Sequence, residues 1–182
     1  MDSLPFGIVT LVEEVYNGSG RSEARMKLLF KQRFFSWFDS YDIYDEAGNI
    51  IFTVQGKLDW GHRLEIYDYN GAHLGTVKEK ILTFLPRFEL YIGERYVGQI
   101  TKEFTFFKPV FTLDCNGWEV RGDWFEWDYK VYDPTSRLIM TASKELFNLT
   151  DTYVIDVANP QNALLSLMIV LAIDAAKCSK SK

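Results

Sequence analysis

The chain has 182 residues, of which 47% are hydrophobic and 16% aromatic, and its formal net charge at neutral pH is −5. This length fits a single domain with a sizeable core. The acidic balance argues against a nucleic-acid binder, which usually needs a basic face to displace the counterions of the phosphates.

Residues 1–25 differ from the rest of the chain. They contain the linker-like sequence Asn-Gly-Ser-Gly-Arg and precede Met26, which opens a clear strand pattern. We interpret 1–25 as an N-terminal extension or an expression-derived segment, with an edge strand at Gly7–Val12 as the alternative. Residues 26–182 are then expected to form one domain.

The cysteines and the start of the chain bear on the cellular compartment. Cys115 and Cys178 are too few for a disulfide framework in a chain of this size and suit a reducing environment. Glu13 and Glu14 interrupt the short apolar run near the start, and no basic segment precedes it, so these residues do not resemble a secretory signal peptide. We therefore expect a cytoplasmic protein.

From Met26 onward a hairpin-like unit recurs. An aromatic strand ends near Tyr or Asp, a tight turn with Gly or Pro follows, and a second alternating strand completes the unit. The units are YDIYDEAGNIIFTVQGKL (41–58), LEIYDYNGAHLGTVKEKI (64–81), FELYIGERYVGQITKEF (88–104) and YKVYDPTSRLIMTASKEL (129–146). The alternation predicts about twelve strands: 27–35, 40–45, 49–55, 63–68, 73–79, 87–92, 95–101, 104–114, 117–122, 125–132, 137–142 and 152–156.

A hydrophobic helix is predicted after the last strand. From Ala163 to Ile173 the sequence reads ALLSLMIVLAI, so a helix here is apolar on nearly every side and must be surrounded by other groups. The run is too short to span a bilayer, which needs about 20 residues. Asn159 suits the N-cap and Pro160 the first helical position, and we expect the helix to end near Lys177. We predict a buried helix and no transmembrane span.

Strands and helix together favour one architecture. A helix needs a lumen of about 10 Å, which barrels of about eight strands do not provide and barrels of about eleven do. Closure also removes the exposed edges that an open sheet would have. We predict a mainly β fold, a closed barrel of about twelve antiparallel strands around a central hydrophobic C-terminal α-helix.

The same segments resemble a known family. The hairpins at 41–58 and 64–81, the closing ALLSLMIVLAIDAAK and the opening MKLLFKQRFFSWFDSY are similar to the LURP-one-related family, and more narrowly to its bacterial YxjI-like branch. The resemblance covers roughly 26–178 and consists of hairpins and one helix, not of catalytic residues. It implies the fold shared with tubby C-terminal domains and phospholipid scramblases.

The resemblance also implies a class of partner. Tubby domains bind phosphoinositides and scramblases associate with membranes, so a membrane phospholipid becomes a candidate ligand. No motif in this chain matches the headgroup ligands of tubby domains, and a shared fold does not imply a shared function. Candidate residues therefore have to come from the chain itself.

Basic residues are denser between Lys78 and Lys108 than elsewhere. Lys78 and Lys80 share a strand face, and phenylalanines such as Phe84 lie near them in sequence. The candidate ligands of a lipid headgroup are Lys78, Lys80, Lys102 and Lys108. The alternative is a solvated face on which interleaved glutamates cancel the positive charge.

The segment Trp124–Asp128 combines aromatic and acidic side chains. Glu126 and Asp128 are expected on one face of a strand, about 7 Å apart, a separation compatible with two carboxylates acting on a glycosidic bond. The alternative is an ordinary half-buried strand, with Trp127 facing inward and both carboxylates in water.

Other chemical signatures are weak. His62 and His73 lie near predicted turns and have no partner at a metal-ligand spacing, so we expect solvated loop histidines and no metal. No glycine-rich phosphate loop and no nucleophile elbow is present, and no cofactor is expected. Since the helix fills the lumen, function is expected at the outer surface or the rim.

These observations indicate a non-enzymatic binding module of the cytoplasm, peripheral to the membrane, whose partner is a phospholipid, in particular a phosphoinositide, or a protein. The alternative function is a carbohydrate-binding or hydrolytic protein that uses Trp124–Asp128. The sequence does not indicate the oligomeric state.

Overall fold

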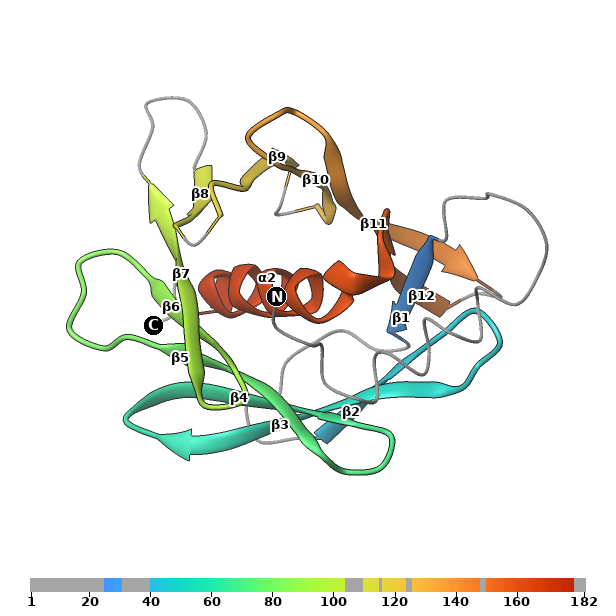
Figure 1. Cartoon of the computed structure of the whole chain (residues 1–182), viewed down its shortest axis with the longest axis horizontal. Helices are drawn as coiled ribbons and strands as arrows, with labels where there is room; N and C mark the ends of the chain where they lie inside the picture. Colours follow the sequence, from blue (N-terminus) through green and yellow to red (C-terminus); the bar gives the residue numbers. More distant parts are fainter. Residues whose placement is uncertain are drawn as a thin grey trace.

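The computed structural model describes residues 25–30, 40–103, 110–114, 116–123, 126–147 and 150–178. Within these ranges the chain forms twelve strands, one short 3-10 helix and one α-helix (Figure 1). The strands are β1 (Met26–Phe30), β2 (Ser40–Tyr44), β3 (Ile50–Asp59), β4 (Gly61–Asp68), β5 (His73–Glu79), β6 (Arg87–Ile92), β7 (Arg95–Glu103), β8 (Val110–Leu113), β9 (Glu119–Asp123), β10 (Asp128–Tyr132), β11 (Leu138–Phe147) and β12 (Thr150–Val157). The helices are η1 (Pro160–Asn162) and α2 (Ala163–Cys178).

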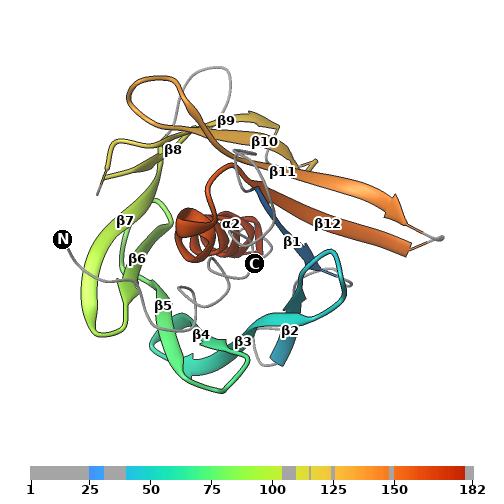
Figure 2. The ribbon, with the colours of Figure 1, turned by 45° about the vertical axis from the view of Figure 1, so that its right-hand side comes forward.

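The strands form a closed antiparallel barrel. Each strand pairs with the next one along the chain, and β1 pairs with both β2 and β12, which closes the ring. Figure 2 shows the wall of strands surrounding α2. The predicted fold, a closed barrel around a C-terminal helix, is confirmed.

Helix α2 is the centre of the hydrophobic core. Leu167, Met168 and Val170 are 0% exposed, and the helix buries side chains on all of its faces. Strand β5 comes close to the helix at Gly75, where a Cβ atom would lie 2.2 Å from Cε of Met168 and 2.6 Å from the carbonyl oxygen of Tyr91. A glycine is therefore required where this strand passes the helix.

Three hairpins share one turn chemistry. An aspartate stands at the end of the first strand, and its carboxylate accepts a hydrogen bond from the backbone N–H four residues later, in the pairs Asp45–Asn49 (2.8 Å), Asp68–Ala72 (2.8 Å) and Asp133–Arg137 (3.0 Å). The third residue after each aspartate has a positive φ, namely Gly48 (87°), Gly71 (81°) and Ser136 (64°). These turns account for three of the four recurring sequence units, and the unit at 88–104 turns at Gly93, which has a φ of 55°.

The start of the helix follows the predicted cap. The side chain of Asn159 accepts a hydrogen bond from the backbone N–H of Gln161 (3.0 Å), and Pro160 is the first helical residue. The first turn is a 3-10 helix that leads into α2, and α2 ends one residue beyond the predicted end. Among the described residues no helix is both long enough and apolar enough to cross a membrane.

Several strands are longer than predicted. Strand β3 continues to Asp59, and β4 already begins at Gly61. Gly56 interrupts the alternation in the sequence, but in the structure it keeps its place in the ladder opposite Leu64. Strands β11 and β12 pair as far as Phe147 and Thr150, and Figure 2 shows them extending together beyond the rest of the barrel.

Some predictions fall outside the described residues. These are the structure of residues 1–24 and the predicted strand segments 31–35 and 104–109. The division into an extension and a domain from residue 26 stays a prediction. Arg25, the first described residue, bonds through Nε to the carboxylate of Asp156 on β12 (3.0 Å).

Candidate functional site

The structure separates the four lysines predicted to bind a headgroup. Lys78 lies on the outer face of β5 and is half-buried, and Lys80, directly after that strand, is exposed. The amine of Lys80 lies 3.5 Å from the carboxylate of Glu89 on β6. Lys108 lies outside the described residues. Of the described lysines in the predicted patch, Lys78 and Lys80 are therefore the ones at the surface.

The expectation that Lys102 belongs to a surface patch is wrong. Lys102 is 1% exposed and lies on the inward face of β7 together with Ile100, which is also 1% exposed. Side chains two residues apart on a strand point to the same face, so the burial of Ile100 fixes the direction of Lys102. The density of lysines in the sequence does not show which of them point into the barrel.

A row of three cations crosses neighbouring strands on the outer face of the barrel. The strand pairing places Lys57 of β3 opposite Arg63 of β4, and Arg63 opposite Lys78 of β5. We call these three residues the cationic row. Cross-strand neighbours have Cβ atoms about 5 Å apart, and like charges in such positions repel each other. The row therefore concentrates positive charge on a protein that is acidic overall.

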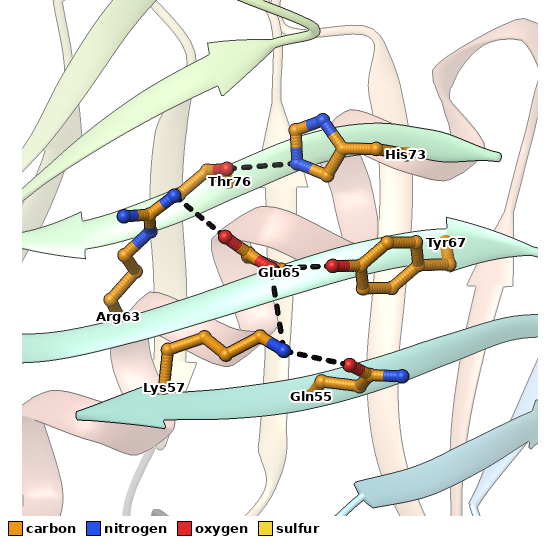
Figure 3. A network of polar contacts seen from close by, with 7 residues as sticks. All are labelled: Gln55, Lys57, Arg63, Glu65, Tyr67, His73 and Thr76. Atoms are coloured by element: carbon orange, nitrogen blue, oxygen red, sulfur yellow. Dashed lines mark hydrogen bonds and ion pairs between the residues drawn. The ribbon is translucent and has the colours of Figure 1, made fainter. Parts of the chain in front are cut away.

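One carboxylate orders the cationic row (Figure 3). One oxygen of Glu65 accepts a hydrogen bond from a terminal nitrogen of Arg63 (2.6 Å). The other oxygen accepts a hydrogen bond from the Tyr67 hydroxyl (2.5 Å) and lies 3.7 Å from the amine of Lys57. Lys57 also donates to the side chain of Gln55 (3.0 Å). Glu65 thus holds two of the three cations in place.

The charge state of Glu65 follows from these contacts. Burial opposes its ionisation, but the hydrogen bond from Tyr67 and the charges of Arg63 and Lys57 outweigh burial, so the pKa of the Glu65 carboxyl is lowered. Glu65 therefore stays ionised at neutral pH. Three cations lie close together in the row, with Glu65 beside Lys57 and Arg63 and with Glu89 of β6 opposite Lys78. An arginine flanked by lysines is an arrangement that binds phosphate.

The predicted carboxylate pair does not share a strand face. Strand β10 begins at Asp128, and Glu126 lies in the preceding turn because Trp127 has a positive φ of 59°. Both carboxylates are exposed, while Trp127 is buried, as the alternative of an ordinary half-buried strand expected. Trp124 lies outside the described residues.

The two histidines are not solvated loop residues as expected. His62 lies on β4 and contacts the carboxylate of Glu79 through both its backbone N–H and its ring. His73 begins β5, bonds to the hydroxyl of Thr76 (3.0 Å) and packs edge-on against Tyr67 (Figure 3). Both are half-buried. Among the described residues, no group of three or more His, Cys, Asp or Glu side chains is arranged to hold a metal ion.

A second polar group lies inside the barrel at the end of α2. Asp174 is 5% exposed, and one of its carboxylate oxygens lies 4.0 Å from the amine of Lys177. Burial raises the pKa of Asp174 to about 8, although the charge of Lys177 acts in the opposite direction. Burial, with a contribution from Asp174, also raises the pKa of the Tyr41 and Tyr129 hydroxyls.

Sequence reasoning missed Lys57 and Arg63. They are far from Lys78 in the chain, and only the strand register brings the three together. In a hairpin, residues at equal distances before and after the turn face each other. Lys57 and Arg63 lie at equal distances from Trp60, and this spacing could have shown that they are neighbours.

Comparisons with known proteins agree with the fold. The model of the LURP-one-related family matches residues 26–174. The uncharacterized protein YxjI of Bacillus subtilis (strain 168) is 31% identical over 150 residues, which are 82% of this chain and 92% of that protein. An X-ray structure of a protein from Arabidopsis thaliana matches with a TM-score of 0.60 at 16% identity, covering 84% of this chain and 92% of the other. The chain belongs to the LURP-one-related family.

Proposed function

We propose that this protein is a non-enzymatic binding module whose outer β3–β5 face binds a phosphate-bearing lipid headgroup at a membrane surface. The observation that supports this most strongly is the cationic row, Lys57, Arg63 and Lys78, lined up across three paired strands. Lys80 lies two residues beyond Lys78 and adds an exposed amine near the same end of β5.

A phosphate would relieve the repulsion within the row. Facing like charges lower the stability of a sheet, and an anion between them replaces repulsion with charge-assisted hydrogen bonds. The fork of Arg63 suits two phosphate oxygens at once, and the lysines act as point charges on either side. Each basic residue at an anionic membrane contributes about 1 kcal/mol to binding, so a small patch of this kind supports weak and reversible attachment.

The test is flotation of the purified protein with liposomes that are neutral, anionic or contain a phosphoinositide, at low and at physiological salt. We expect binding to anionic liposomes that weakens as salt rises, because the charges are screened. The double variant Arg63→Gln/Lys78→Gln should lose about 2 kcal/mol of affinity, a roughly 30-fold change. Stronger binding to liposomes that contain the phosphoinositide than to other anionic liposomes of the same total charge would show selectivity for that headgroup.

The chain offers a matched control. Arg121 on β9 and Lys130 on β10 also face each other across a strand pair, and Figure 2 places these strands on the other side of α2 from β3 and β4. Arg121→Gln/Lys130→Gln removes the same charge and should leave binding nearly unchanged. Equal losses in both double variants, or no binding of the unmodified protein to any anionic liposome, would contradict the proposal. In the second case protein partners become the place to look.

A further inference from the structure

Three large apolar side chains stand almost fully in solvent at one end of the barrel. Trp60 in the β3–β4 turn is 84% exposed, and Leu82 and Phe84 in the β5–β6 loop are 100% and 98% exposed. Among the described residues, the large hydrophobic side chains exposed at the other end reach only 54%, at Tyr69. Exposed apolar groups gathered at one place mark an interaction surface.

The two connections that carry these side chains are joined to each other. A Cβ atom on Gly61 would lie 2.8 Å from Cγ2 of Ile81, so the β3–β4 turn packs directly on the β5–β6 loop. The backbone N–H of His62 donates to the carboxylate of Glu79 (3.1 Å), which ties the two bases together. The turn and the loop therefore form one surface, which we call the apolar tip: Trp60, Ile81, Leu82 and Phe84.

The β5–β6 loop has a fixed shape that turns its apolar side chains outward. Its ends are closed by the hydrogen bond from the Lys80 N–H to the Arg87 carbonyl (2.9 Å). The hydroxyl of Thr83 lies 2.7 Å from the carbonyl oxygen of Leu85 and 3.1 Å from that of Lys80, so the residue between Leu82 and Phe84 holds the loop from within. Leu82 adopts a φ of 61°, which a leucine rarely does.

The charges at the base of the apolar tip favour an anionic partner. Lys80 and Arg87 are exposed at the base of the loop. Lys78 of the cationic row lies on β5, two residues before Lys80. An apolar tip with cations set behind it matches the cross-section of an anionic bilayer, where acyl chains lie beneath phosphates.

From this arrangement we infer that the apolar tip inserts into the outer layer of an anionic bilayer, so that the barrel docks with its β3–β4 and β5–β6 end toward the membrane. The inference rests on the proposed function and adds to it the orientation of the protein and a binding component that salt does not remove.

The experiment compares two double variants in vesicle binding. Leu82→Ser/Phe84→Ser removes the centre of the tip, and Ile50→Ser/Tyr69→Ser removes exposed apolar side chains at the opposite end, at the start of β3 and in the β4–β5 turn. With phosphatidylserine-containing vesicles, the tip variant should bind at least about tenfold more weakly at low and high salt alike. The opposite-end variant should bind as the unmodified protein does. All four side chains are at least 40% exposed, so neither variant is expected to disturb folding.

A second readout measures insertion itself. An environment-sensitive fluorophore on Leu82→Cys, with Cys115 and Cys178 replaced by alanine, should shift to the blue when these vesicles are added, and one on Tyr69→Cys should not. If the tip variant binds like the unmodified protein and the Leu82→Cys probe does not shift, insertion is overturned while the proposed function stands. If the unmodified protein does not bind anionic vesicles at all, both are overturned.

Discussion

At the scale of single residues, Asp174 is a carboxylic acid buried inside the barrel. It lies near the C-terminal end of α2, where the helix dipole disfavours a negative charge. It faces Lys177 on the same helix, and its charge adds to the larger effect of burial in raising the pKa of the Tyr41 and Tyr129 hydroxyls. With its own pKa raised to about 8, Asp174 is protonated in the folded protein at neutral pH.

This gives the folding stability a pH dependence of known sign. In the unfolded chain Asp174 ionises near its ordinary pKa of about 4, whereas in the folded chain it ionises near 8. Between these values Asp174 holds its proton more tightly in the folded state, so its own contribution to stability is fully present below the unfolded pKa and is lost as pH rises toward 8. The slope is at most about 1.4 kcal/mol per pH unit.

The prediction is that Asp174→Asn removes this slope. Urea denaturation between pH 5 and pH 8 should show the free energy of unfolding of the unmodified protein falling relative to that of the variant. Asp133→Asn is a control that removes a carboxylate titrating outside this pH range. Hydrogen bonds from Thr135 and Arg137 lower the pKa of Asp133, so its contribution is lost only below its unfolded pKa of about 4, and between pH 5 and pH 8 the Asp133→Asn curve should run parallel to that of the unmodified protein. Parallel curves for Asp174→Asn and the unmodified protein would contradict a buried neutral acid.

At the scale of elements, the fit of α2 against β5 depends on the missing side chain of Gly75. We predict that Gly75→Ala destabilises the protein by about 1–3 kcal/mol, because the new methyl group overlaps Cε of Met168 and the Tyr91 carbonyl. Met168→Leu should recover part of this loss in the double variant, since it removes Cε. Chemical denaturation of the four proteins gives the coupling energy, and additive effects would show that the helix does not press on Gly75.

Leu167 tests whether α2 is the core of the fold. It is 0% exposed, so Leu167→Asp should lose about 3–5 kcal/mol, a large part of the stability of an ordinary domain. Leu167→Met keeps the volume and should lose less than about 1.5 kcal/mol. Thermal unfolding followed by circular dichroism distinguishes them. A Leu167→Asp protein that folds normally would mean that the helix is not enclosed by the barrel.

How much the sequence predicts depends on whether the signal is local. The cap at Asn159 and the glycine turns at Gly48 and Gly71 were predicted correctly because a few adjacent residues set the backbone there. The end of β3 was not, because its partner strand carries it past Gly56.

The candidate site shows the same limit. Lys78 and Lys80 could be grouped from the sequence because they lie two residues apart. The positions of Lys57 and Arg63 beside Lys78 depend on the pairing of three strands. Lys102 was misplaced because the density of charge was given more weight than the alternation that begins at Ile100.

At the scale of the whole molecule, the barrel separates a structural interior from a surface available for binding. The lumen holds α2 (Figure 2), and β3, β4 and β5 carry the cationic row on their outer face, beside the end of the barrel where the apolar tip lies. The account therefore predicts that one side of the barrel faces the membrane and the opposite wall faces water.

The most direct measurement of this claim is acetylation of lysines by a water-soluble reagent, read by mass spectrometry, with and without anionic vesicles. Lys57, Lys78 and Lys80 should become several-fold less reactive when vesicles are present, whereas Lys130 on the opposite wall and Lys27 on β1 should not change. Uniform protection of all lysines, or protection of Lys130 and not of the row, would contradict the β3–β5 face as the membrane-binding surface.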